Sequence, residues 1–205
     1  MKKFPSIIPV FPLNGVIYFP KTNLPLNIFE KRYLDLVNDT YSKDKFMGMV
    51  QSQKDGENVY KVGCLGKISD LQKIKDGRIL INLTGITRFK ILEEINNDKL
   101  YREFKVDYKN FETDLKSYTS DLNTEELMEK AKVFLKKNGL LLNWREFEKL
   151  DKIQRINTLS MISPVTNEEK QKLLEAITVK DKIETLNNII GFYLHDNNFN
   201  NRTIQ

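Results

Sequence analysis

The sequence predicts an α+β fold, in which a strand-rich amino-terminal part that holds one helix is followed by a helical part. Up to about residue 115, short apolar runs with β-branched or aromatic residues alternate with turn signals, a pattern typical of strands. From about residue 123, apolar residues recur at helical spacing between capping signals. With 205 residues, 40% of them hydrophobic, the chain is long and apolar enough to bury a core.

The strand-rich part is expected to span residues 1–115. We predict strands at residues 7–11, 16–19, 46–53, 62–72, 78–92 and 101–111. Asp55-Gly56 and Asp76-Gly77 are expected to form hairpin turns, because glycine tolerates the positive φ that such turns require. These strands should form an antiparallel sheet.

The strand at residues 78–92 is expected to have one clearly apolar face. Ile79, Ile81 and Leu83 alternate with Leu80 and Asn82, so that one set should face the core. Aspartate at position 81 is therefore expected to unfold this part of the protein.

One helix is expected to interrupt the strands. Apolar residues between positions 28 and 37 fall at helical spacing, and Pro25, which breaks helices, precedes them. We therefore predict a helix over residues 28–37.

The helical part is expected to span residues 123–195 in four or five helices. Three pairs have the spacing of helix caps, namely Asn123 with Glu126, Asn143 with Glu146, and Thr166 with Glu169. The polar segment 113–123 should connect the two parts. The asparagine-rich tail, residues 196–205, is expected to be disordered.

Composition predicts a cytoplasmic protein. Its apolar runs are all shorter than the roughly 20 residues that cross a bilayer. Pro5 and Pro9 interrupt the start of the chain, which lacks the apolar region of a signal peptide. Cys64 is the only cysteine, as expected in a reducing compartment. The net charge of +5 is spread among acidic residues rather than clustered, which argues against nucleic-acid binding.

The sequence offers little material for catalysis, and we expect no cofactor and no metal. Residues 15–22, GVIYFPKT, satisfy the phosphate-loop pattern except at Pro20, which has no backbone N–H to offer a phosphate. His195 is the only histidine and is expected to lie exposed at the end of the last helix. We therefore expect that the protein neither hydrolyses ATP nor cleaves casein.

One long segment is distinctive, residues 9–33, PVFPLNGVIYFPKTNLPLNIFEKRY. It resembles the opening of Lon protease amino-terminal domains, in which a Phe-Pro pair follows the second strand and Pro-Leu-x-Ile-Phe-Glu-x-Arg-Tyr starts the helix. Further matches are Val62-Gly63, Asp76-Gly77-Arg78, Gly85-x-x-Arg88-Phe89 and, more weakly, Ser163-Pro164 with Glu169, Lys170, Gln171 and Leu174. The chain is therefore identified as a member of this substrate-binding domain family.

The resemblance implies a PUA-like β pseudo-barrel with one helix, followed by a helical bundle. It also implies a role in capturing unfolded or extended segments of other proteins and in delivering them to a protease or chaperone. The chain is too short to add the ATPase and peptidase domains of full-length Lon, so we expect a free-standing, non-enzymatic version. RNA binding is the alternative, because PUA-like barrels also occur in RNA-modifying proteins.

The loop and helix start between positions 19 and 33 are the expected binding surface, because two prolines stiffen a loop rich in apolar residues. The candidate contact residues are Phe19, Pro20, Leu24, Pro25, Phe29, Glu30, Lys31 and Arg32. The competing interpretation is that these apolar residues belong to the core, namely Phe19, Ile28, Phe29 and Phe89. Arg32 and Arg88 are candidates to pair with buried carbonyls or with a carboxylate such as Glu30. A paired change, Leu24→Asp with Lys31→Glu, is expected to weaken capture while barely altering the melting temperature.

Overall fold

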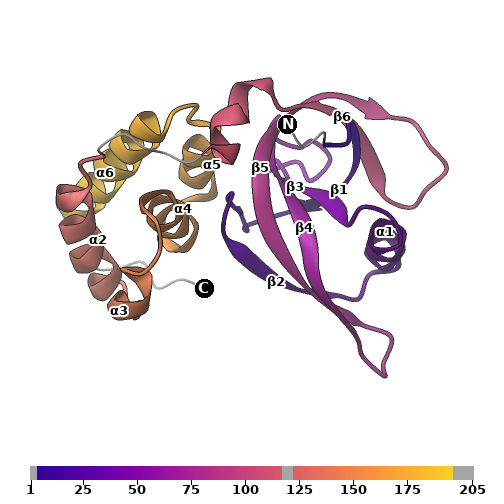
Figure 1. Ribbon diagram of the computed structural model, residues 1–205, viewed down its shortest axis with the longest axis horizontal. Helices are drawn as coiled ribbons and strands as arrows, with labels where there is room; N and C mark the ends of the chain where they lie inside the picture. The colour runs from indigo at the N-terminus through magenta and orange to yellow at the C-terminus, as the bar shows by residue number, and fades with distance from the viewer. Residues whose placement is uncertain (1–3, 117–121, 196–205) are drawn as a thin grey trace. The chain divides into compact units, whose positions relative to one another are not determined.

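A computed structural model describes residues 4–116 and 122–195, and the chain divides into two compact units, Met1–Ser117 and Tyr118–Gln205. The first unit contains β1 (Ile7–Leu13), β2 (Asn23–Ile28), α1 (Lys31–Tyr41), β3 (Phe46–Gln51), β4 (Val62–Lys73), β5 (Ile79–Ile95), β6 (Arg102–Asp107) and the 3₁₀ segment η1 (Lys109–Leu115). The second contains α2 (Glu125–Lys137), α3 (Trp144–Phe147), α4 (Lys152–Ile162), α5 (Asn167–Glu175) and α6 (Val179–His195). This architecture confirms the α+β prediction (Figure 1).

The six strands form one sheet that closes into a barrel. Their order is β2-β5-β4-β3-β1-β6, and β6 also pairs with β5. The length of β5 makes this closure possible, because its first half pairs with β2 and its last residues pair with β6. Strand β2 therefore lies outside the closed ring, at an edge of the sheet. The hairpin turns are confirmed, since Gly56 has φ of 75° and Gly77 has φ of 92°.

The sheet is mixed rather than fully antiparallel. Strands β1 and β3 run parallel, with Val10 opposite Gly48 and Leu13 opposite Gln51. A parallel pair needs a long crossover connection. Strand β2 and helix α1, which lie between β1 and β3 in the chain, supply it. The expectation of an antiparallel sheet is thus wrong for this pair.

The predicted strand at residues 16–19 is wrong, and the second strand comes later. Ile17, Tyr18 and Phe19 are all buried in an irregular loop, so the run is apolar on every side rather than alternating. Strand β2 follows at Asn23–Ile28 and contains Pro25, which the sequence analysis assigned to a helix boundary. Proline is tolerated there because β2 is an edge strand, where a missing N–H costs little.

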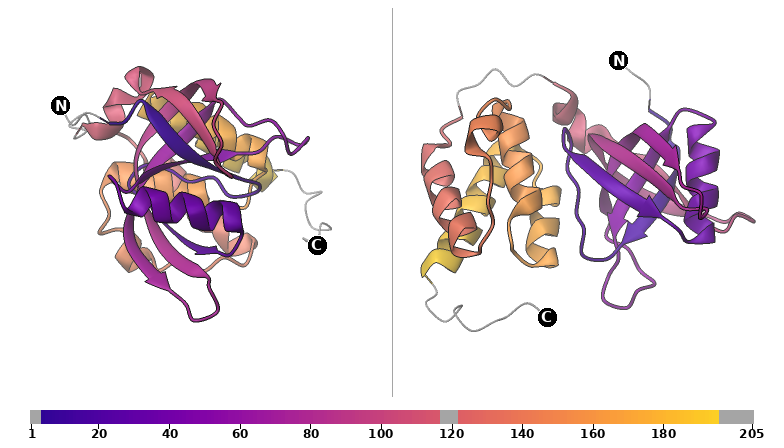
Figure 2. Two further views of the ribbon diagram at one scale, coloured as in Figure 1. Left: turned by 90° about the vertical axis from the view of Figure 1, so that its right-hand side faces the viewer. Right: turned by 90° about the horizontal axis from the view of Figure 1, so that it is seen from below.

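Helix α1 begins three residues later than predicted, at Lys31, because Ile28 is still part of β2. Its buried residues Tyr33, Leu36 and Val37 form the predicted stripe. The helix packs against β1 and β3, and the rings of Tyr33 and Phe11 lie 4.1 Å apart. Both views in Figure 2 show α1 on the outside of the barrel.

The barrel core is filled from five strands by the buried residues Ile8, Val10, Val50, Leu65, Phe89, Ile91, Phe104 and Val106. The last predicted strand, residues 101–111, is too long. Strand β6 ends at Asp107, and Phe111 lies buried in η1. The predicted strand reaches Phe111 because a large aromatic residue is as typical of a strand as of the buried side of η1.

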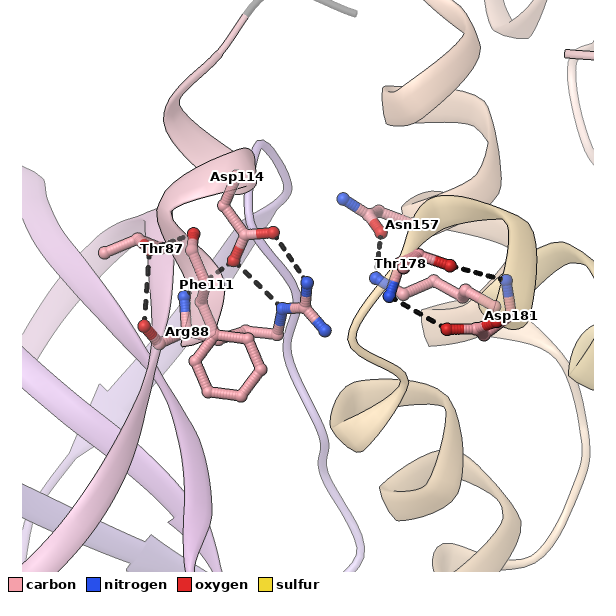
Figure 3. A network of polar contacts seen from close by, with 8 residues as sticks. Thr87, Arg88, Phe111, Asp114, Asn157, Thr178 and Asp181 are labelled. Carbon is pink, nitrogen blue, oxygen red and sulfur yellow. Dashed lines mark hydrogen bonds and ion pairs between the residues drawn. The ribbon is translucent and has the colours of Figure 1, made fainter. Parts of the chain in front are cut away.

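A buried ion pair fastens η1 to β5 (Figure 3). Arg88 donates from Nε and Nη2 to the two carboxylate oxygens of Asp114, over distances of 2.9 and 2.8 Å. The Arg88 backbone N–H also donates to Asp114, and the guanidinium lies 4.4 Å from the centre of the Phe111 ring. The carboxylate that Arg88 meets is therefore Asp114 and not Glu30.

The second unit is built from α2, α4, α5 and α6 packed together, with the short α3 between α2 and α4. Two predicted caps are confirmed: Asn143 accepts from the Glu146 N–H, and Thr166 with Glu169 forms a full capping box. The third differs, because Thr124 occupies the cap position of α2. The predicted tail, residues 196–205, and part of the predicted connection lie outside the described residues.

A polar contact is buried inside the second unit. Lys182 of α6 donates to the side-chain oxygen of Asn157 of α4 over 2.8 Å, and at the start of α6 Thr178 and Asp181 exchange two hydrogen bonds of 3.1 Å each (Figure 3). These bonds join α4 to α6 and fix the first turn of α6. Across the described residues, none of the helices has the length and apolar character that a membrane crossing requires.

Candidate functional site

Three of the eight predicted contact residues are buried. Phe19 and Pro20 lie against β5, where a Cβ on Gly85 would come within 2.2 Å of the Phe19 carbonyl oxygen. Leu24 faces inward from β2, opposite Leu83. Because these side chains are inaccessible, they contribute to packing rather than to an exposed contact surface. They are therefore not part of the candidate site.

Burial of Leu24 also changes the expected behaviour of the paired substitution. Leu24→Asp would place a carboxylate at a buried position opposite Leu83, at a cost of several kcal/mol. The melting temperature should therefore fall, and any loss of binding by that variant would report unfolding.

The other five predicted residues are exposed and follow one another closely. Pro25 lies in β2, Phe29 and Glu30 join β2 to α1, and Lys31 and Arg32 are the first two residues of α1. Strand alternation turns Ile28 into the core and leaves Phe29 outside, with 65% of its surface exposed. Residues 29–32 are called the helix-start segment.

A small cleft adjoins the helix-start segment. Its volume is about 160 Å³, and it is lined by Pro12, Arg32, Tyr33, Ser52, Gly56, Leu100, Tyr101 and Arg102. These residues come from the end of β1, the first turn of α1, the hairpin between β3 and β4, the loop between β5 and β6, and the first residue of β6. Leu100 is 57% exposed and is the most exposed apolar side chain of the lining. Nothing in the local sequence of the loop between β5 and β6 marks it as a neighbour of α1, so its residues could not be predicted as part of the site.

Each arginine of the cleft is held by a carboxylate. Arg32 binds Glu30, with its Nη2 atom 2.8 Å from the nearer oxygen, and its guanidinium lies 4.5 Å from the Tyr33 ring centre. Arg102 binds both oxygens of Glu94, over 2.6 and 2.7 Å. The charges of both arginines are therefore offset by neighbouring carboxylates, and the cleft wall is close to electrically neutral.

Ionisation of the cleft does not change near neutral pH. Burial, together with the hydrogen bond to Asp39, raises the pKa of Tyr101 to about 12. Burial likewise raises the pKa of Tyr33, and the hydrogen bond from Arg102 lowers the pKa of Glu94. The tyrosines therefore stay neutral and Glu94 stays charged at pH 7.

The segment that resembles a phosphate loop is arranged differently from such a loop. The N–H of Lys21 donates to the carbonyl of Gly85 over 2.9 Å, and the Thr22 hydroxyl donates to the Phe19 carbonyl over 2.7 Å. Strand β2 follows it, where a phosphate loop would lead into a helix. Among the described residues, histidine, cysteine and carboxylate side chains form no group suited to a metal, and Cys64 is buried.

Comparison with known proteins identifies a matching family model and several relatives of the chain. The family model of the ATP-dependent protease La (LON) substrate-binding domain matches residues 7–191. The Lon protease of Syntrophus aciditrophicus is 27% identical over 208 residues, covering 94% of this chain and 26% of that protein. The Lon protease of Cytophaga hutchinsonii is 31% identical over 103 residues, covering 47% of this chain and 13% of that protein. The chain thus spans about a quarter or less of the length of these relatives.

Two solved structures of Lon amino-terminal domains have a fold similar to that of this chain. A Lon N-terminal domain protein from Xanthomonas campestris superposes with a TM-score of 0.63 at 19% identity, over 92% of this chain and 99% of that one. The N-terminal domain of the Mycobacterium avium complex Lon protease gives a TM-score of 0.65 at 14% identity, over 90% and 98% of the two chains. These likenesses concern the fold. Because the family model covers most of its residues, the chain belongs to the LON substrate-binding domain family.

Proposed function

We propose that the chain binds unfolded or extended protein segments through the helix-start segment and its adjoining cleft. The observation that carries this proposal is the exposure of two large apolar side chains: Leu100 lines the cleft together with Arg32, and Phe29 precedes Arg32 by three residues in the chain. Exposed apolar groups beside a concave, polar-rimmed site are typical of protein contact surfaces.

The size of the cleft favours single side chains over folded partners. Its volume of about 160 Å³ is well below the roughly 300–1,000 Å³ of pockets that enclose a drug-sized ligand. One apolar side chain of an extended segment fits such a volume, and Phe29 offers a second contact outside it. Affinity should therefore be weak and should depend little on the exact sequence of the segment.

The wider role that we propose rests on the relatives. They are Lon proteases, and the family model is that of a substrate-binding domain. We infer that the segments captured here are delivered to a protease or chaperone in the cytoplasm. The chain itself is proposed to act by binding and not by catalysis.

Replacing Phe29 and Leu100 together by serine tests the proposal. A labelled, uncharged peptide of leucine, serine and glycine should bind this variant about tenfold more weakly, a loss of about 1.4 kcal/mol, because two apolar contacts are removed. Fluorescence anisotropy measures the affinity. Both side chains are largely exposed, so the stability of the fold should change by only about 0.5 kcal/mol.

The matched control is Leu92→Ser, which removes a 50% exposed apolar side chain of β5 that does not line the cleft. It should bind the peptide as the parent does. Equal binding by the parent and the Phe29/Leu100 variant would refute the site. Binding of single-stranded RNA that weakens steeply as salt rises would favour the alternative function, since apolar capture depends little on salt.

A further inference from the structure

A second surface of the barrel is an open depression with a volume of about 550 Å³, at the end of α1. It is lined by Lys43, Asp44, Lys45, Lys67, Ile68, Ser69, Thr84 and Ile86. We call it the basic depression. Its residues differ from those of the cleft beside the helix-start segment.

Two β-bulges shape this depression. Along the β4–β5 pair, Leu65 lies opposite Thr87 and Gly66 opposite Gly85, so Ile86 is an extra residue in β5. The register shifts again between Ile68 and Asp70, where Ser69 is an extra residue in β4. Bulges redirect side chains and are frequent next to functional sites. Both extra residues line the depression.

The backbone holds Lys45 at the rim. Its φ of 66° turns the chain from α1 into β3, and its N–H donates to the Thr40 carbonyl over 3.1 Å. The Lys45 carbonyl accepts from the Ile68 N–H over 2.9 Å, which ties this turn to β4. Lys67 stands on β4 directly opposite Phe46, the first residue of β3. The two lysines therefore lie at adjacent positions across the β3–β4 pair.

The positive charge of the three lysines is only partly offset by acidic side chains. Within the described ranges, Lys43, Lys45 and Lys67 have no carboxylate oxygen within 4.0 Å, whereas Lys99 and Lys105 each form an ion pair with a glutamate. The one acidic residue of the lining, Asp44, accepts a hydrogen bond from the Phe46 N–H over 3.0 Å. Three positive charges and one negative charge leave an excess of two, which attracts an anionic partner.

Neighbouring aromatic rings distinguish between anionic partners. The ammonium of Lys45 lies 4.3 Å from the Tyr41 ring centre, and that of Lys67 lies 5.7 Å from the Phe46 ring centre. Proteins that bind single-stranded nucleic acid stack bases on open aromatic faces. Here each ring has a face taken by a lysine, so the depression suits carboxylates better than bases.

We propose that the basic depression binds acidic, extended segments of protein. Aspartate and glutamate side chains of such a segment would pair with the three lysines, while the hydroxyls of Ser69 and Thr84 line the surface between the strands. This surface goes beyond the proposed function. It selects segments by charge, and the cleft beside the helix-start segment selects them by apolar side chains.

A labelled peptide of alternating glutamate and serine tests the proposal, beside its counterpart with glutamine in place of glutamate. The glutamate peptide should bind the full chain, and its affinity should fall as salt rises because exposed charge pairs are screened. The triple variant Lys43→Glu, Lys45→Glu and Lys67→Glu should weaken binding about tenfold or more, since attraction becomes repulsion. Equal binding of the two peptides would overturn the proposal.

A charge-matched control is Lys61→Glu, Lys73→Glu and Lys90→Glu, three exposed lysines of the same unit that lie outside the depression. It should keep most of the affinity, and an equal loss would show that net charge alone decides binding. If the first triple variant is unfolded by circular dichroism, Lys43→Gln with Lys67→Gln takes its place, with a several-fold loss expected. Tighter binding of single-stranded RNA than of the glutamate peptide would also overturn the proposal.

The proposed apolar site and the proposed acidic-segment site can be tested independently, because each has its own peptide and its own variant. The Phe29/Leu100 serine variant should keep its affinity for the glutamate peptide, and the lysine variant should keep its affinity for the uncharged peptide. Loss of both affinities in either variant would mean that the two surfaces are one site, which contradicts the proposal of a distinct acidic site.

Discussion

Replacing Ile81 by aspartate is expected to unfold the barrel. Ile81 is only 3% exposed, and its neighbours across β5 are Leu26 of β2 and Leu71 of β4. A carboxylate there would lose its hydration without gaining a partner, at a cost of about 3 kcal/mol or more. Domains of this kind are stable by only about 5–15 kcal/mol, so such a cost is a large fraction of the whole stability. Thermal denaturation followed by circular dichroism measures the change.

The adjacent residue supplies the control. Leu80 points to the opposite face of β5 and is 39% exposed, so Leu80→Asp should change stability by about 1 kcal/mol or less. The contrast between two neighbouring positions tests the orientation of β5 and not merely its presence. Similar losses at both positions would show that the inward and outward faces have been assigned wrongly.

Removing the guanidinium of Arg88 is expected to be similarly damaging. In the variant Arg88→Met, the Asp114 side chain, only 9% exposed, would lose both donors from the arginine side chain (Figure 3). Leaving one member of a buried ion pair unpaired costs about 3–5 kcal/mol. The hold of η1 on β5 should weaken as well. Urea denaturation measures the stability, and hydrogen exchange at Phe111 measures the local opening.

A second variant distinguishes the cost of leaving a buried charge unpaired from the cost of losing the packing of the two side chains. Arg88→Met combined with Asp114→Leu removes both charges, and it should recover a large part of the lost stability because no buried charge is left unpaired. A loss below about 1 kcal/mol in the single variant would contradict this role for the pair. So would a double variant that is no more stable than the single one.

The fold class could be predicted because it follows from the order of strands and helices, and each of these is marked by residues close together in the sequence. The alternation of β5 and the caps at Asn143 and Thr166 depend on residues within a few positions of one another, and all three are confirmed. The position of the second strand could not be predicted in this way. Burial of the loop before β2 and the edge position of Pro25 are set by pairing with β5, far along the chain.

The candidate site likewise combines features that could be predicted from the sequence with features that depend on tertiary contacts. Sequence could mark the segment from Phe19 to Arg32 as unusual, but it could not tell that Phe19 packs against β5 while Phe29 remains exposed. Tertiary contact decides between these two outcomes for identical side chains. Leu100 joins the site only because the β5–β6 loop comes beside α1, and Asp114 meets Arg88 only because η1 folds back on β5.

The proposed binding surface is tested most directly by mapping it. The backbone amide signals of the isotopically labelled chain can be followed by NMR while the uncharged peptide of leucine, serine and glycine is added. We expect signals of residues 29–33 and 100–102 to shift in proportion to binding, and those of Leu92 and of α4 to α6 to stay in place. Shifts confined to α4, α5 and α6, with residues 29–33 unchanged, would contradict the account.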